Sequence, residues 1–136
     1  MARRGKDRRA VRPTGAQLEI LGVLWDRGPS TVREVHDRLA RGRELGYTTV
    51  LKLLQIMAEK GLVRRDESQR AHVYSARMPA EQTQRQLIGD LLERAFGGSA
   101  ASLVQQALSA KTSPEEIARI REYLDALEGE AEGRKP

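Results

Sequence analysis

Three segments with the apolar period of a helix, followed by two short segments typical of strands, occur within residues 13–78. Apolar residues recur at three- and four-residue spacings in the helical segments, and they alternate with polar residues in the last strand segment. The helices are expected near residues 14–26, 30–41 and 48–60, and the strands near residues 62–65 and 71–75. Three helices and a hairpin within about 65 residues predict a mainly α chain with a winged helix-turn-helix domain, whose wing is the small β-hairpin.

Capping residues mark the boundaries of these helices. Thr14 with Gln17, and Thr31 with Glu34, match the capping box, in which each side chain bonds the backbone N–H of the other residue. Gly61 follows the third helix, where glycine is favoured because it adopts a left-handed backbone without steric cost. Capping signals and apolar spacing therefore predict the same helices.

The third helix carries a strip of polar side chains. Thr48, Lys52, Gln55 and Glu59 fall on one face, and Thr49 lies beside it. The major groove of B-DNA admits one helix, in which Lys donates to guanine or phosphate, Gln pairs with adenine, and Thr methyl groups touch thymine. We therefore expect Thr48, Thr49, Lys52 and Gln55 to read bases. A solvated helix surface shows the same kind of strip, so the strip alone does not establish DNA binding.

Charge is divided unevenly along the chain. Residues 1–77 contain 17 Lys and Arg against 9 Asp and Glu, a formal charge of +8, whereas residues 78–136 contain 7 against 10, a charge of −3. A basic first half indicates contact with a polyanion, although a merely solvated basic surface has the same composition. The side chains expected to contact the DNA backbone without reading sequence are Arg43, Tyr47, Arg64, Arg65, Arg70 and His72. Arg70, at the wing tip, is the strongest candidate for a phosphate or minor-groove contact.

Residues 1–12 contain six basic residues and one acidic residue, with no apolar periodicity. We predict that they form a disordered basic arm. Such an arm either lies along DNA phosphates or serves only as a solubilising tail.

The second half of the chain is predicted to be a separate helical domain, residues 79–129. Pro79 fits the first position of a helix, and the pair at residues 97–98, two glycines, breaks the helical pattern. Ser113 before Pro114 is a strong helix start. Gly129 is expected to end the last helix, and residues 130–136 are expected to be a frayed tail.

The apolar stripes of this second domain indicate a homodimer. Three short helices cannot bury all of these stripes on one another, whereas pairing with a second copy would cover them. The residues expected at the dimer contact are Leu87, Leu91, Leu103, Ile117, Ile120 and Leu124. Two copies would place two reading helices about 34–36 Å apart, in successive major grooves of a palindromic site. The alternative is a monomer whose C-terminal helices pack back onto the first domain.

Several functions are disfavoured by what the sequence lacks. The chain contains no Cys, which excludes disulfides, thiol nucleophiles and thiolate metal sites. No apolar run approaches the about 18 residues of a membrane span, and the basic N-terminus lacks the apolar stretch of a secretory signal, so we expect a cytoplasmic protein. His36 and His72 lie in different segments, and neither a Gly-rich phosphate loop nor a Ser-His-Asp arrangement is recognisable. We expect no enzyme activity, catalytic residue, metal site or cofactor.

Four stretches of the chain resemble the penicillinase-repressor family, the BlaI/MecI/CopY type. They are residues 21–25 (LGVLW), 31–39 (TVREVHDRL), 47–63 (YTTVLKLLQIMAEKGLV) and 70–75 (RAHVYS). The run from YTTV to EKGLV is the most specific of them, because EKGLV by itself occurs in many winged helices. The likeness extends over about residues 13–128.

This resemblance implies an N-terminal winged helix and a C-terminal helical dimerisation domain. It also implies repression of β-lactamase, metal-homeostasis or respiration genes from dyad operators. Many members are released when a membrane sensor-protease pathway leads to a cut at an Asn-Phe bond after a Ser-Leu-Val stretch. In this chain residues 102–104 are Ser-Leu-Val, but Gln106 and Ala107 stand where the Asn-Phe pair would be. The chain also lacks the C-terminal cysteines of the copper-responsive branch.

The sequence as a whole predicts a sequence-specific transcriptional repressor, a homodimer on a double-stranded DNA operator. The family resemblance implies β-lactamase or stress-response genes as its targets. A winged-helix adaptor that binds acidic proteins without reading DNA is the alternative. Salt-sensitive binding to duplex DNA separates the two hypotheses.

Overall fold

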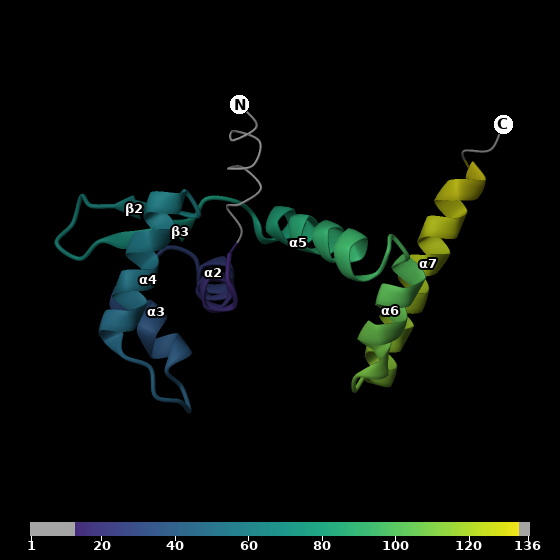
Figure 1. Cartoon of the computed structure of the whole chain (residues 1–136), viewed down its shortest axis with the longest axis horizontal. Helices are drawn as coiled ribbons and strands as arrows, with labels where there is room; N and C mark the ends of the chain where they lie inside the picture. The colour runs from purple at the N-terminus through teal and green to yellow at the C-terminus, as the bar shows by residue number, and fades with distance from the viewer. Residues whose placement is uncertain (1–12, 134–136) are drawn as a thin grey trace. The chain divides into compact units, whose positions relative to one another are not determined.

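The computed structural model describes residues 13–133 (Figure 1), so the predicted basic arm at residues 1–12 lies outside the described residues, as do residues 134–136. The chain divides into two compact units, residues 1–87 and 88–136. The predicted boundary at residues 78–79 lies just before helix α5 (Ala80–Ala95), and the division between the units falls inside that helix.

The N-terminal unit is a winged helix-turn-helix domain, as predicted. It contains three helices and a three-stranded antiparallel sheet with strand order β1-β3-β2, whose first strand lies between the first two helices in the chain. The elements of this domain are α2 (Gly15–Arg27), β1 (Ser30–Thr31), α3 (Val32–Leu39), α4 (Tyr47–Lys60), β2 (Val63–Asp66) and β3 (Val73–Ala76). Strands β2 and β3, with the loop between them, form the wing (Figure 1).

Both predicted capping boxes are confirmed. The Thr14 side chain accepts from the backbone N–H of Gln17 at 3.3 Å, and the Gln17 side chain accepts from the Thr14 N–H at 3.0 Å. Thr31 and Glu34 form the same reciprocal pair, at 3.2 and 2.9 Å. Gly61 ends α4 with φ 81°, the left-handed conformation that favours glycine.

Strand β1 is not predicted from the sequence. Ser30 and Thr31 pair with Tyr74 and Val73 of β3, so Thr31 ends a strand and caps α3 at the same time. Two residues are too short to show a period of two, and their pairing partners lie more than forty positions away along the chain. The consequence is that the start of α3 is fixed against the wing.

The core of the N-terminal unit is formed by the apolar faces of the three helices and the sheet. Val35, Val50, Leu54 and Met57 are fully buried, and the buried Tyr74 contributes the largest side chain from the sheet. This packing fixes the face of α4 that points inward. The opposite face of α4 therefore remains open to solvent.

Trp25, the single Trp of the chain, ties α2 to the segment before α5. It packs against the core, and its indole Nε1–H donates to the backbone carbonyl of Met78 at 2.9 Å. A half-buried indole N–H needs such an acceptor. The bond holds the last residues of the winged-helix domain beside α2.

The C-terminal unit contains the end of α5 together with α6 (Ala100–Ser109) and α7 (Pro114–Gly133). The predicted break is confirmed, because Gly97 and Gly98 both have positive φ, at 57° and 83°. The predicted start of α7 is also confirmed, since the Ser113 hydroxyl accepts from the backbone N–H of Glu116 at 3.0 Å.

The prediction that Gly129 ends the last helix is wrong. Helix α7 continues through residues 130–133, which the sequence assigned to a frayed tail. A single interior glycine costs a helix only about 1 kcal/mol relative to alanine, and good helix formers (Glu128, Glu130 and Ala131) surround it. Helix stop signals are decisive only where the following residues also disfavour a helix.

Candidate nucleic-acid interface

Helix α4 presents the predicted reading residues on its solvent face. Thr48, Thr49, Lys52 and Gln55 are all exposed, because the buried side of the same helix is anchored by the core. Their exposure satisfies the geometric requirement for a helix that enters a groove of DNA. Their contact with bases remains a prediction.

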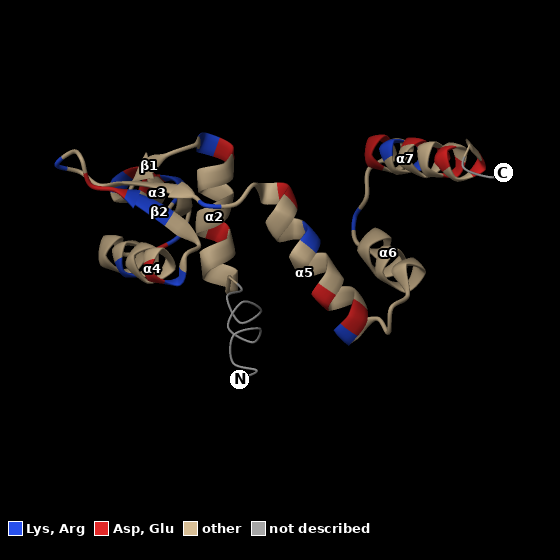
Figure 2. Ribbon diagram, turned by 90° about the horizontal axis from the view of Figure 1, so that it is seen from above, with Lys and Arg blue, Asp and Glu red and all other residues tan. Residues whose placement is uncertain are grey.

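An open groove of about 420 Å³ lies between the starts of α3 and α4 and the wing. It brings together residues that are far apart in the sequence: Arg33, Tyr47, Gln55, Arg65, Arg70 and His72. Its lining contains three arginines and no acidic side chain among the described residues. Figure 2 shows the same basic character as blue segments along β2 and in the loop that joins β2 to β3. Four of the predicted backbone contacts, Tyr47, Arg65, Arg70 and His72, thus share one surface.

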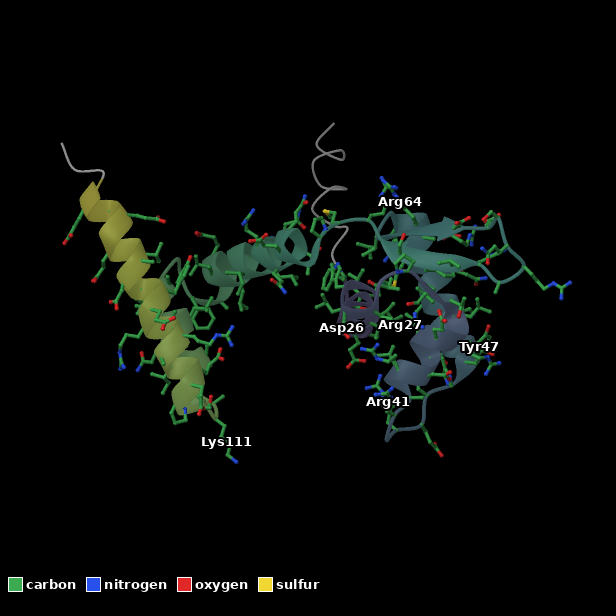
Figure 3. The ribbon with its side chains drawn as sticks, turned by 180° about the vertical axis from the view of Figure 1, so that it is seen from behind. Asp26, Arg27, Arg41, Tyr47, Arg64 and Lys111 are labelled. Atoms are coloured by element: carbon green, nitrogen blue, oxygen red, sulfur yellow. The ribbon has the colours of Figure 1, made fainter. Side chains whose placement is uncertain are left out.

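Arg43 and Arg64, the other two predicted backbone contacts, do not line this groove. Arg43 donates to the Glu19 carboxylate at 2.7 Å, and that bond lowers the pKa of Glu19 and raises the pKa of Arg43. Arg64 lies after the C-terminal end of α4, whereas Tyr47 begins that helix (Figure 3). A role in DNA binding for Arg43 would require its guanidinium to exchange a carboxylate partner for a phosphate.

The wing arginine Arg65 is oriented by two neighbours. The pKa of Arg65 is raised mainly by a hydrogen bond with the side chain of Tyr74. The charge of the Glu67 carboxylate, 2.7 Å away, raises it further. The buried Tyr74 hydroxyl thereby reaches a polar partner at the surface. Arg65 is a fixed cation on the groove wall, although part of its charge is offset by Glu67.

Two residues, Arg33 in the groove lining and His36 beside Tyr47, are not marked by any pattern in the sequence. The guanidinium carbon of Arg33 lies 5.3 Å from the centroid of the Tyr47 ring, and the His36 ring packs edge-on to Tyr47 at 6.0 Å. His36 Nε2 lies 2.6 Å from the carbonyl of Leu45, to which it donates. Only the pairing of β1 with β3, which brings the start of α3 to the wing, makes Arg33 part of the groove.

Across residues 13–133, no three His, Asp or Glu side chains are grouped as a metal site would need. None of the helices in this range is both long and apolar enough to cross a membrane.

Comparison with known proteins identifies the family of the chain. The sequence pattern of the penicillinase repressor family matches residues 13–126. The chain is 34% identical over 120 residues to the transcriptional regulator BlaI of Mycobacterium tuberculosis. The matched region covers 86% of each chain.

Two solved structures are similar over most of the chain. The transcriptional regulator Tm0710 of Thermotoga maritima is 23% identical, with a TM-score of 0.49 and coverage of 90% of this chain and 79% of that one. The YusO protein of Bacillus subtilis is 20% identical, with a TM-score of 0.48 and coverage of 91% and 80%. On the match to the family pattern and the identity to the mycobacterial relative, the chain belongs to the penicillinase-repressor family.

Proposed function

We propose that this chain, a DNA-binding repressor by family, acts as a homodimer on a dyad operator and reads each half-site with α4. The observation that carries the proposal is the exposed polar face of α4 beside a groove lined by arginines without acidic residues. A helix of this kind fits the major groove, while the flanking cations fit the phosphate backbone. In this function the chain catalyses no reaction and acts in the cytoplasm.

The reading residues are assigned by the chemistry of their side chains. Lys52 donates to guanine, and Gln55 forms two bonds with adenine, whereas Thr48 and Thr49 contact thymine methyl groups. A good two-bond contact discriminates against the wrong base by about 1–3 kcal/mol. Gln55 also lines the groove, so base reading and backbone contact adjoin each other.

The C-terminal unit is proposed to supply the dimer contact. Neither α6 nor α7, both described in full, contains a buried residue. Three of the predicted contact residues, Leu91, Ile117 and Leu124, are 46%, 41% and 53% exposed. The other three, Leu87, Leu103 and Ile120, are half-buried. A second copy would remove this apolar surface from water, which is the main driving force for association.

Ile117→Glu tests the dimer. A charge in an apolar contact between copies is costly, so sedimentation should shift from dimer to monomer, and Arg119→Ala, on another face of the same helix, should leave the dimer unchanged. A wild-type chain that sediments as a monomer with and without DNA would contradict the proposal. So would an Ile117→Glu variant that dimerises like the wild type.

Release from DNA through a sensor-protease pathway is also part of the proposal, with no bond assigned to the cut. The residues that follow Ser-Leu-Val lie within the exposed part of α6. Because Gln106 and Ala107 replace the Asn-Phe pair, a protease specific for that pair should leave this chain intact.

Gel-shift titration against fragments of the source genome tests the function. The wild type should prefer a small set of fragments over random duplex at moderate salt. Lys52→Ala and Gln55→Ala should change which fragments are preferred, whereas Arg70→Ala should weaken binding to all fragments alike. Failure of the wild type to prefer any fragment would favour the adaptor alternative.

A further inference from the structure

We infer that the groove between α3, α4 and the wing binds a phosphodiester of the operator backbone, with Arg33 as its ligand and Tyr47 as the residue that positions Arg33. This inference rests on the proposed function, because the phosphodiester is that of duplex DNA. It adds a contact on α3, outside the reading helix and the wing, to the proposed mode of binding.

Arg33 differs from three other arginines around α2 and α3, which are paired with carboxylates. Arg27, Arg38 and Arg43 bond to Glu34, Asp26 and Glu19, at 3.0, 2.6 and 2.7 Å. Arg33 is exposed and has no carboxylate partner within residues 13–133. Its recorded contact is the Tyr47 ring, which does not neutralise its charge.

The stack on Tyr47 leaves the hydrogen-bonding capacity of Arg33 unused. A guanidinium that packs over a ring at 5.3 Å keeps its in-plane N–H donors available, and these donors match the oxygens of a phosphate. Tyr47 is itself held by the His36 ring at 6.0 Å, and His36 is fixed by its bond to the Leu45 carbonyl. Arg33 is therefore oriented before an anion arrives, which reduces the entropy lost on binding.

The wing supplies the facing wall of the groove. Arg65, Arg70 and His72 line it together with Arg33, and no Asp or Glu of the described residues is part of the lining. Glu67 bonds to Arg65 beside the groove, so Arg33 and Arg70 are the lining arginines without a recorded carboxylate partner in residues 13–133. An anion between α3 and the wing would meet cations from both sides.

The position of the groove indicates DNA as the source of this anion. Gln55, a proposed reading residue, lines the groove with Tyr47, so a phosphate held by Arg33 would belong to the strand that α4 contacts. A phosphate contact fixes orientation and register without reading sequence. Arg33 should thus contribute equally to operator and random duplex.

The test uses the full-length chain, with affinity measured for the preferred fragment and for random duplex across about 50–300 mM salt. Because a dimer carries two copies of Arg33, Arg33→Ala should weaken binding to both duplexes by about a hundredfold, about tenfold for each copy, and make the slope of log affinity against log salt shallower by about 1.8. Arg119→Ala removes the same charge from the other unit and should change neither quantity. An Arg33→Ala slope equal to that of Arg119→Ala, or a changed preference between the two duplexes, would overturn the inference.

Variants of Tyr47 test the positioning role. Tyr47→Phe keeps the ring and should keep the salt slope of the wild type, whereas Tyr47→Leu should weaken binding and reduce the salt slope. In the Arg33→Ala background, Tyr47→Leu should have no further effect on the slope. An equal effect of Tyr47→Leu on the slope in both backgrounds, or a slope in Tyr47→Phe as shallow as in Tyr47→Leu, would contradict positioning through the ring.

Two kinds of failure are distinguishable. If the wild type prefers no fragment, the proposed function fails. If the wild type is selective and salt-dependent but Arg33→Ala behaves like Arg119→Ala, only the phosphate site fails. Thermal unfolding by circular dichroism confirms that each variant is folded before its affinity is compared.

Discussion

Replacing Thr31 by Val separates its two structural roles. Thr31 pairs with Val73 in the sheet, and its hydroxyl caps α3 by accepting from the Glu34 N–H at 3.2 Å. Valine keeps the β-branched shape that suits the strand but cannot cap. Loss of a threonine cap costs about 1 kcal/mol, which lowers Tm by about 4–8 °C in a domain of this size.

Thermal unfolding followed by circular dichroism measures this effect, with two further variants for comparison. Thr31→Ser keeps the hydroxyl and should unfold close to the wild type, while Thr14→Val removes the corresponding cap of α2 and should show a loss of similar size. If Thr31→Val has the Tm of the wild type and Thr31→Ser is lower, the hydroxyl does not stabilise α3 and the reasoning is refuted.

Three other perturbations have defined outcomes. Leu54→Ala, at a fully buried position of α4, should lower the free energy of unfolding by about 2–5 kcal/mol in a urea titration, and a loss below about 1 kcal/mol would contradict the core described here. Gly61→Ala should destabilise by about 1–2 kcal/mol because φ is 81° there, whereas an unchanged urea midpoint would show that the backbone relaxes freely. The hydrogen bond from Arg43 is the main reason why the pKa of Glu19 lies below 4.5, and the bond from the Thr31 backbone is the main reason for Glu34. Both carboxylates therefore stabilise the fold above pH 4.5, and this stabilisation is lost as the pH falls through the lowered pKa values. In the double variant Glu19→Gln, Glu34→Gln, the free energy of unfolding should fall less steeply between neutral and acid pH than in the wild type. An unchanged pH dependence would contradict this role of the two carboxylates.

The helices of the winged domain are predictable because their signals are local. A capping box depends on residues three positions apart, and the left-handed turn at Gly61 depends on one residue. The apolar spacing of Val50, Leu54 and Met57 likewise fixes which side of α4 faces the core. The face of α4 proposed to read DNA follows directly, since it is the side that the core does not use.

The groove is not predictable by the same means. Strand β1 exists because Ser30 and Thr31 find partners on β3, and no local pattern encodes that pairing. Arg33 is one of many arginines in the sequence and is distinguished only by where β1 places it. Gly129 fails as a helix end for a related reason, because its neighbours outweigh a single weak breaker.

The central claim is that two copies of α4 read the two halves of a palindromic site. Selection of bound sequences from a randomised duplex library by the full-length chain tests it most directly. We predict enrichment of an inverted repeat whose half-sites are about one helical turn apart, with a changed half-site for Lys52→Ala or Gln55→Ala. Enrichment of no motif, or of the same motif by the wild type and both variants, would contradict base reading by α4.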